Sequence, residues 1–333
     1  MKVNKEQLLK ALAQVKPGLS NNEMLEQSTH FCFSPNSIHT YNDQISVTYK
    51  IDTGISGTIP ATKFYQLIQK LPERDLEIEM KEGNVMIQSG RSSSHILTQE
   101  QINTPVIDPD QIKGWSPLPE DFCESLSFCS FSASRDMTRP SFTCIHIKGD
   151  TTESFDNFRG TIKKLSGKIN DDFLLPATAA NELIKYSPIK YAVMDNWIHF
   201  INEEGTLFSS RTVDDVFPEI LPLFEFDGVS ISLSDKVQEI VDRIQVLATA
   251  EFEQDRVIKM TINKGKLTCR GEGDLGWIQE YTKVDYKGDI IEISIHPTFL
   301  YQILKYSTDI MIGDGRALFE GKQFKHVMQL LGA

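Results

Sequence analysis

The sequence predicts an α+β protein made of three copies of one domain, and three observations lead there. An amphipathic helix introduced by a proline recurs at nearly equal intervals, within residues 59–71, 175–186 and 295–306. Another amphipathic helix precedes it in each copy, and the two helices recur at matching intervals. Short strands with tight turns fill the rest without a βαβ alternation, which favours antiparallel sheets.

Each recurring stretch predicts the second helix of a domain. In the first copy Phe64, Leu67, Ile68 and Leu71 fall on one helical face behind Pro60, and a proline begins a helix at little cost. The earlier helices have equivalent apolar faces at residues 8–15, 122–129 and 237–247. We therefore expect domains at residues 1–112, 113–224 and 225–333, joined by proline-rich linkers around 104–119 and 217–222.

The composition is that of an ordinary globular protein, with 40% hydrophobic and 24% charged residues. No apolar run approaches the roughly 18 residues of a membrane span. The polar start Met1–Glu6 does not resemble a signal peptide. Five cysteines without a CxxC pair suggest reduced thiols in a cytoplasmic compartment.

The net charge of −12 argues against a protein that coats nucleic acid with its whole surface, but it permits a local basic face. The predicted helices and their ends offer such cations: Lys5, Lys10, Lys16, Lys63, Lys70, Arg74, Lys185, Lys236, Arg243 and Lys305. For any single lysine a solvated helix face is the simpler reading. Equivalent helices on one surface would instead present these cations to phosphates.

The segment Gly271–Gly276 is a literal GxGxxG motif. A dinucleotide site needs a helix after the motif, whereas Trp277–Tyr281 is typical of a strand. Glu272 and Asp274 would also repel a pyrophosphate. We interpret the motif as a loop between strands.

The sequence contains no P-loop, HExxH or GxSxG motif, and its seven histidines lack metal-ligand spacing. We predict no catalytic residue, no metal and no cofactor. The alternative is a metal-dependent nuclease or nucleotide-processing enzyme that uses the pairs Asp171-Asp172 and Asp214-Asp215. Acidic pairs at strand ends are usually solvated, which disfavours this alternative.

Several short segments, in order, resemble the bacterial-type DNA sliding clamp, the beta subunit of DNA polymerase III. They are Pro60–Phe64, Leu71-Pro72, Ser89–Ser92, Phe155–Arg159, Phe217-Pro218 and Val327-Met328. The resemblance spans the whole chain. It implies a non-catalytic processivity factor whose chains pair head to tail into a homodimeric ring, with helices lining the pore and sheets outside. Such a ring encircles double-stranded DNA without reading its sequence. A clamp-derived scaffold that never encircles DNA is a further alternative.

The resemblance also implies a pocket for short apolar peptide motifs of the polymerase and the clamp loader. The matching residues here are Phe155, Asp156, Phe158, Arg159, Pro222, Val327, Met328 and Leu330. Phe158 replaces the family's histidine and Asn157 its glycine, and the tail Gln329–Ala333 departs from the family's ending. The partner motif is therefore expected to differ from the usual bacterial one.

At the subunit joint the resemblance implies apolar contacts by Ile96, Val246 and Leu247. Ser94 is smaller than the family's aromatic residue there, so a weaker joint is expected. These departures suit a phage or plasmid as well as a chromosome. The expected location is the cytoplasm, at the nucleoid, or the host cytoplasm if a phage encodes the protein, with no membrane partner.

Overall fold

The computed structural model describes residues 1–331, and it divides into two compact units. The first unit combines Met1–Ser127 with Ser166–Asp214, and the second combines Phe128–Leu165 with the chain from Asp215 onward. Residues 332 and 333, with which the third predicted domain ends, lie outside the described part. The middle third of the chain contributes to both units, and the division into three domains stays a prediction.

The first unit contains two antiparallel sheets. In order, the four-stranded sheet consists of β1 (Lys2–Asn4), β6 (Asp75–Lys81), β7 (Asn84–Ser89) and β8 (Ser92–Ile96). The eight-stranded sheet consists of β5 (Gly57–Pro60), β2 (His30–Ser34), β3 (Ser37–Tyr41), β4 (Ile45–Lys50), β14 (Leu207–Arg211), β13 (Trp197–Ile201), β12 (Lys190–Met194) and β9 (Ser116–Pro117). The pair β4–β14 joins the first third of the chain to the middle third.

The second unit also contains two antiparallel sheets. The six-stranded sheet runs β10 (Cys144–Phe155), β11 (Arg159–Pro176), β22 (Phe324–Gln329), β21 (Arg316–Glu320), β20 (Asp309–Gly313) and β15 (Val229–Ser232). The four-stranded sheet runs β18 (Gly276–Lys283), β17 (Lys266–Gly273), β16 (Ile258–Asn263) and β19 (Ile291–Ile295). Here the pair β11–β22 joins the middle third to the last third.

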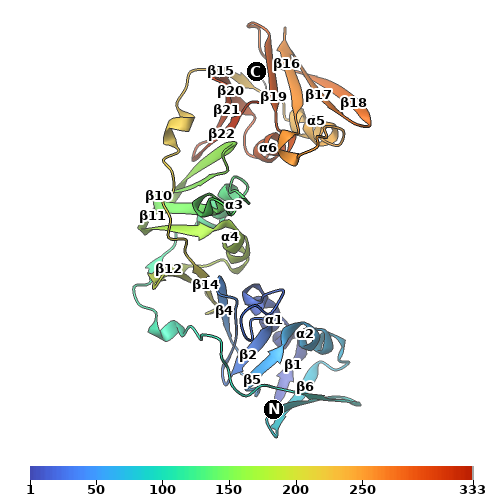
Figure 1. Ribbon diagram of the computed structural model, residues 1–333, viewed down its shortest axis with the longest axis vertical. Coiled ribbons are helices and arrows are strands. Elements are labelled where there is room, and N and C mark those ends of the chain that lie inside the picture. Colours follow the sequence, from blue (N-terminus) through green and yellow to red (C-terminus); the bar gives the residue numbers. More distant parts are fainter. Residues whose placement is uncertain (332–333) are drawn as a thin grey trace. The chain divides into compact units, whose positions relative to one another are not determined.

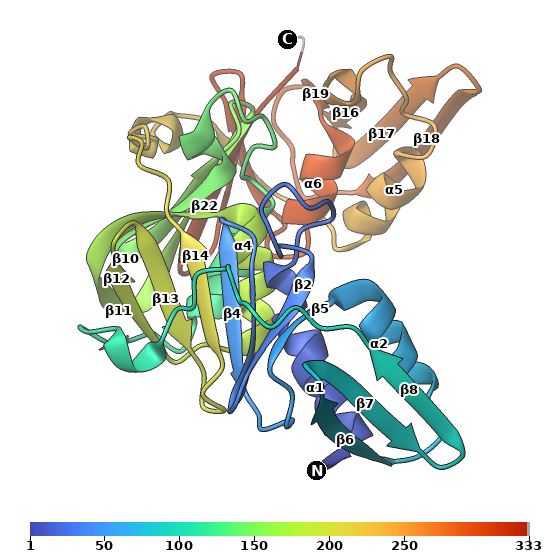
Figure 2. The same ribbon diagram turned by 60° about the horizontal axis from the view of Figure 1, so that its bottom comes forward.

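The recurring helices form where the sequence predicts them. They are α1 (Lys5–Val15), α2 (Ala61–Lys70), α3 (Phe122–Ser130), α4 (Ala177–Leu183), α5 (Lys236–Ile244) and α6 (Pro297–Ile303). The two outer pairs, α1 with α2 and α5 with α6, each lie side by side (Figure 1). In Figure 2 the strands β6, β7 and β8 are seen next to α1 and α2. The α+β class with antiparallel sheets is confirmed.

Helix α1 illustrates how the local sequence fixes an element. Asn4 caps its first turn, because its Oδ1 accepts a hydrogen bond from the amide of Gln7 at 3.1 Å. The apolar residues spaced by three and four positions, Leu8, Leu12 and Val15, are fully buried. Their burial is what anchors the helix, since a short helix gains little stability from propensity alone.

The GxGxxG segment is a β-hairpin between β17 and β18, as predicted. The model adds a packing reason for its first glycine. A Cβ on Gly271 would lie 2.6 Å from Cγ2 and 2.8 Å from the carbonyl oxygen of Ile244, at the end of α5. Gly271 thus allows α5 to lie directly on β17.

Four of the five cysteines are buried, and all five are free thiols. Burial raises the pKa of Cys32 and Cys144 to about 11 and that of Cys129 and Cys269 to about 12. These thiols therefore act as small apolar core residues. Within residues 1–331, every helix is too short or too polar to span a bilayer.

Candidate partner-binding pocket and cationic helix surface

An apolar pocket of about 410 Å³ opens in the second unit. It lies where the β10–β11 turn meets β22, the β20–β21 turn and the short 3-10 helix Leu221–Phe224. Six of the eight residues predicted for a partner pocket line it: Phe155, Phe158, Arg159, Val327, Met328 and Leu330. The pocket is thus assembled from segments far apart in the sequence, as the resemblance implies.

The β10–β11 turn is held in shape by Asp156. Its Oδ1 accepts hydrogen bonds from the amides of Phe158 at 3.1 Å and Arg159 at 3.0 Å. Asn157 has a φ of 73°, in the left-handed region that asparagine tolerates better than most residues. The replacement of the family's glycine by Asn157 therefore preserves the turn.

Arg159 connects the pocket to helix α6. Its guanidinium is 8% exposed and donates from Nε to Asp156 Oδ2 at 2.9 Å, and it also donates to Gln302 on α6. It lies 3.8 Å from the ring centre of Phe299 on the same helix. Burial lowers the pKa of Arg159, while the charge of Asp156 opposes that shift. The ion pair with Asp156 offsets part of the cost of burying the charge of Arg159.

The apolar wall of the pocket is also core. Val327, Met328 and Leu330 are 3%, 1% and 8% exposed. An alanine at Met328 would therefore leave a cavity in the core as well as alter the pocket. Phe158 is 37% exposed at the mouth, so it can be replaced with less effect on the core.

Seven residues that line the pocket were not predicted from the sequence: Asn157, Gly160, Leu223, Asp314, Gly315, Arg316 and Gln329. Leu223 lines it in place of the neighbouring Pro222, which is exposed. Arg316 donates from Nη1 to the carbonyl of Leu223 at 3.0 Å, pairs with Asp314, and lies 4.7 Å from the ring centre of Phe226. The glycines at 313 and 315 indicate a turn, and a turn there predicts that Arg316 begins the next strand.

In the first unit the predicted cations fall into two groups. Lys5 donates to the carbonyl of Leu71 at 2.8 Å, Lys10 pairs with Glu204 at 2.9 Å, and Lys185 pairs with Glu182 at 2.8 Å. Lys16 lies 3.3 Å from the ring centre of Tyr65. By contrast, Lys63, Lys70 and Arg74 are exposed and have no ion-pair partner among residues 1–331. The unpaired cations thus belong to α2 and the segment after it.

In the second unit Arg243 is occupied by carboxylates. It donates from Nε and Nη2 to Glu280 at 2.8 and 2.7 Å, and Glu239 lies 4.0 Å away. These bonds raise the pKa of Arg243 and lower that of Glu280. Lys236 is exposed on α5, and Lys305 lies 4.9 Å from the ring centre of Tyr301.

The residues predicted for a subunit joint lie at sheet edges. Ile96 is half-buried on β8, the last strand of its sheet. Val246 and Leu247 follow α5, which packs against β18, the edge strand of the sheet in the second unit. Val246 is 70% exposed.

The acidic pairs of the nuclease alternative do not form a metal site. Asp171 accepts a hydrogen bond from the hydroxyl of Tyr191 at 2.8 Å, and Asp215 accepts from the amide of Val216 at 2.8 Å. Within residues 1–331 no three histidine, cysteine or acidic side chains gather where they could hold a metal ion.

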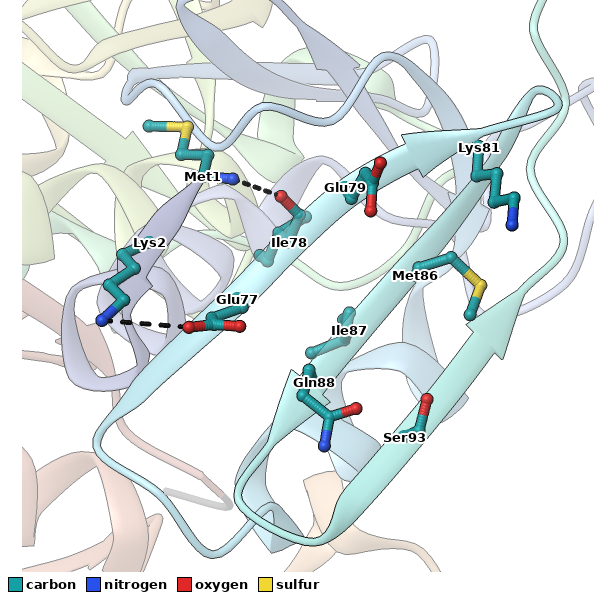
Figure 3. Close-up of a pocket in the computed structure, with 10 residues that line it drawn as sticks. All are labelled: Met1, Lys2, Glu77, Ile78, Glu79, Lys81, Met86, Ile87, Gln88 and Ser93. Carbon is teal, nitrogen blue, oxygen red and sulfur yellow. Dashed lines mark hydrogen bonds and ion pairs between the residues drawn. The ribbon is translucent and has the colours of Figure 1, made fainter.

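A further hollow of about 600 Å³ lies on the outer face of β6 and β7 (Figure 3). It mixes both charges, with Lys2 3.8 Å from Glu77, and the amino group of Met1 donates to the carbonyl of Ile78 at 2.7 Å. Such a mixed surface favours no single class of ligand.

Known proteins similar to this chain in sequence or in fold include bacterial sliding clamps. No protein-family model matches the chain. The beta sliding clamp of Chlamydia pneumoniae is 24% identical, over 94% of this chain and 91% of that protein. The structure of the DNA polymerase III beta chain from Streptococcus pneumoniae matches with a TM-score of 0.87 at 19% identity, over 100% of this chain and 99% of that one.

The resemblance to the bacterial-type sliding clamps is confirmed. The clamp of Bartonella birtlesii, solved with griselimycin bound, also matches, with a TM-score of 0.86 at 19% identity over 100% of this chain and 99% of that one. The structural likeness extends over the whole of this chain, so the fold is similar to that of the clamp subunits.

Proposed function

We propose that the protein is a DNA sliding clamp, a non-catalytic processivity factor that encircles duplex DNA and tethers its polymerase. The observation that carries this proposal is the match in fold, over the whole of this chain, to a clamp subunit. The recurring helices of this chain support it. The role needs no catalytic group. It suits a cytoplasmic location at the nucleoid and three domains of about equal length.

The contact with DNA is proposed to run through the helix surfaces. Sliding requires attraction to phosphates without reading of bases, and exposed lysines supply such attraction. Lys63, Lys70 and Arg74 are suited to it because they are exposed and unpaired among residues 1–331. The whole chain has a net charge of −12, so the surface away from these cations is acidic on balance and would disfavour binding of DNA at the outside.

We propose that ring closure repeats the strand pairing by which the chain joins its own repeats. The edge strand β4 of the first repeat pairs with β14 of the second, and β11 of the second pairs with β22 of the third. The corresponding edge of the third repeat is β18, and the corresponding edge of the first is β8. We expect β18 of one copy to pair with β8 of a second copy, since an unpaired edge is a template for another strand.

A charge at this joint should open the ring. Val246→Asp places a carboxylate at an exposed apolar position beside β18, so it should halve the mass in solution without unfolding the chain. Val216→Asp, at a residue that is 84% exposed, is the matched control and should leave the mass unchanged. Equal masses for both variants would argue against this joint.

The pocket is proposed to hold a short apolar segment of the polymerase or the loader. Phe158→Ala should weaken binding of such a peptide about tenfold or more, because exposed aromatic residues often dominate peptide contacts. Phe252→Ala, an exposed phenylalanine that does not line the pocket, should leave binding unchanged. Unaltered peptide affinity in Phe158→Ala would contradict the assignment.

Encirclement of DNA can be tested by the topological link between a closed ring and a circular DNA molecule. The protein is incubated with nicked circular DNA, crosslinked briefly at its amines, and washed with concentrated salt. A ring closed around a circle survives the wash, because it does not depend on ionic contacts, and it leaves once the circle is cut. A crosslinked dimer that washes off intact circles would favour the scaffold alternative.

A further inference from the structure

A second groove lies in the first unit, at a position that the internal repeat makes equivalent to the pocket. It has a volume of about 360 Å³ and is formed by the linker residues 105–112 and strands β3 and β13. Its apolar surface comes from Val106, Ile107, Met194, Trp197 and Tyr41. The assigned function uses none of these residues.

The equivalence rests on two turns. In the β3–β4 turn Asn42 Oδ1 accepts from the amides of Gln44 at 3.1 Å and Ile45 at 2.7 Å. Asp156 makes the same two bonds in the β10–β11 turn. The middle residues Asp43 and Asn157 have φ values of 70° and 73°. Tyr41 therefore stands where Phe155 stands in the pocket.

The second turn corresponds as well. Asp195 and Asn196 join β12 to β13 with φ values of 51° and 63°. Asp314 and Gly315 join β20 to β21 with φ values of 49° and 68°. The residues that follow, Trp197 and Arg316, both line their grooves. The same backbone frame thus presents different side chains.

The two grooves have opposite charge. The pocket of the second unit is lined by the cations of Arg159 and Arg316 with the single carboxylate of Asp314. The groove of the first unit is lined by the carboxylates of Asp108 and Asp195, and no lysine or arginine lines it. A ligand for the second groove should accordingly be cationic.

The floor of the groove contains a histidine with an unsatisfied nitrogen. His199 is 2% exposed, and its Nδ1 is 2.8 Å from Ser209 Oγ. Its Nε2 has no hydrogen-bond partner among residues 1–331. Burial lowers the pKa of His199 to about 4, so the ring is neutral at pH 7.

We propose that this groove binds a short segment of a partner protein in which a lysine or arginine adjoins an apolar side chain. The apolar side chain packs among Val106, Ile107 and Met194, and the cation faces Asp108 and Asp195. The proposal is independent of ring closure and of DNA binding, so it can fail while the clamp assignment stands.

Methionine methyl groups allow both grooves to be observed in one experiment. The full chain is labelled with ¹³C at its methionine methyls, and Met194→Leu identifies the Met194 resonance. The probes are the hexapeptide Gly-Lys-Leu-Phe-Lys-Gly and a control with glutamate at both lysine positions. We expect the lysine peptide to shift the Met194 resonance saturably and to leave that of Met328 unchanged.

Single carboxylate replacements locate the site. Asp108→Asn and Asp195→Asn should each weaken the lysine peptide about threefold, with a larger loss at low salt. Asn also tolerates the left-handed φ of Asp195. Asp314→Asn, at the equivalent turn of the other groove, is the matched control and should change nothing.

The proposal is overturned if Met194 shows no saturable shift up to about 2 mM peptide. It is equally overturned if the glutamate peptide binds as well as the lysine peptide, or if only Met328 responds.

Discussion

The helix pairs α1–α2 and α5–α6 hold the same place in their repeats, yet their surfaces differ. Residues 61–74 carry three cations against the single carboxylate of Glu73. On α5, Lys236 and Arg243 are balanced by Glu239 and Asp242, and Arg243 is bound to Glu280. The buried faces repeat because packing requires them, whereas the exposed charges are not constrained by packing. We infer that attraction to DNA is concentrated at the first pair.

Charge reversal at the first pair should have the largest effect. The triple variant Lys63→Glu, Lys70→Glu and Arg74→Glu should lower affinity for duplex DNA about 100-fold at low salt, because several phosphate contacts are lost together. Fluorescence polarisation with a labelled duplex measures this. Reversal of Lys113, Lys287 and Lys322, which are exposed elsewhere, gives the same net charge and should have little effect. Equal losses of DNA affinity in both triple variants would contradict the inference that the pair α1–α2 provides most of the attraction to DNA.

The stability of the region around the pair α5–α6 should be sensitive to added side-chain volume where α5 packs on its sheet. Gly271→Ala forces a Cβ against Ile244 and should lower the free energy of unfolding by about 2 kcal/mol. Urea denaturation is followed by fluorescence in a background with Trp115→Phe and Trp197→Phe, in which Trp277 in β18 is the remaining tryptophan and reports on this region. In the control Gly167→Ala the nearest atom would be 3.5 Å away, an ordinary contact. A urea midpoint as high as that of the control would contradict close packing of α5 on β17.

Acid should weaken both pairs through buried histidines near the starts of their second helices. Helix α6 begins after His296, and His30 on β2 lies opposite Pro60, which precedes α2. Burial lowers the pKa of both histidines. The neutral rings are favoured in the folded state, so their contribution is present above about pH 6.5 and is lost as pH falls. The free energy of unfolding should therefore decrease as the pH is lowered below about 6.5.

This effect can be isolated by substitution. His296→Gln should flatten the pH dependence of the urea midpoint observed through Trp277. His95→Gln, at an exposed histidine, should leave that dependence as it is. If the urea midpoint of His296→Gln depends on pH as that of the unsubstituted protein does, His296 is not the cause of the loss of stability in acid.

The smallest expected effect is an increase in affinity for duplex DNA. Glu239→Lys adds a cation to α5 and removes a carboxylate 4.0 Å from Arg243, so affinity for duplex DNA should rise about threefold. Glu225→Lys, in the linker, is the control with the same net charge and should leave the affinity unchanged. A rise of the same size in the control would indicate a general charge effect.

The sequence predicted the repeat, the six helices and the nature of the GxGxxG segment, because these depend on periodicity and turn residues close together in the chain. It located most of the pocket through the resemblance. It missed Arg316 and Leu223, and it did not reveal that Arg243 is paired with Glu280, since those contacts join distant segments. The second groove was also not foreseen, because the equivalence of Asn42 and Asp156 becomes evident only from their hydrogen bonds.

The most direct test of the account is the mass of the purified protein, measured by sedimentation across a dilution series. The clamp proposal predicts a species of twice the 37.7 kDa chain that persists over a range of concentrations. A monomer at every concentration would contradict closure of a ring by two copies of this chain.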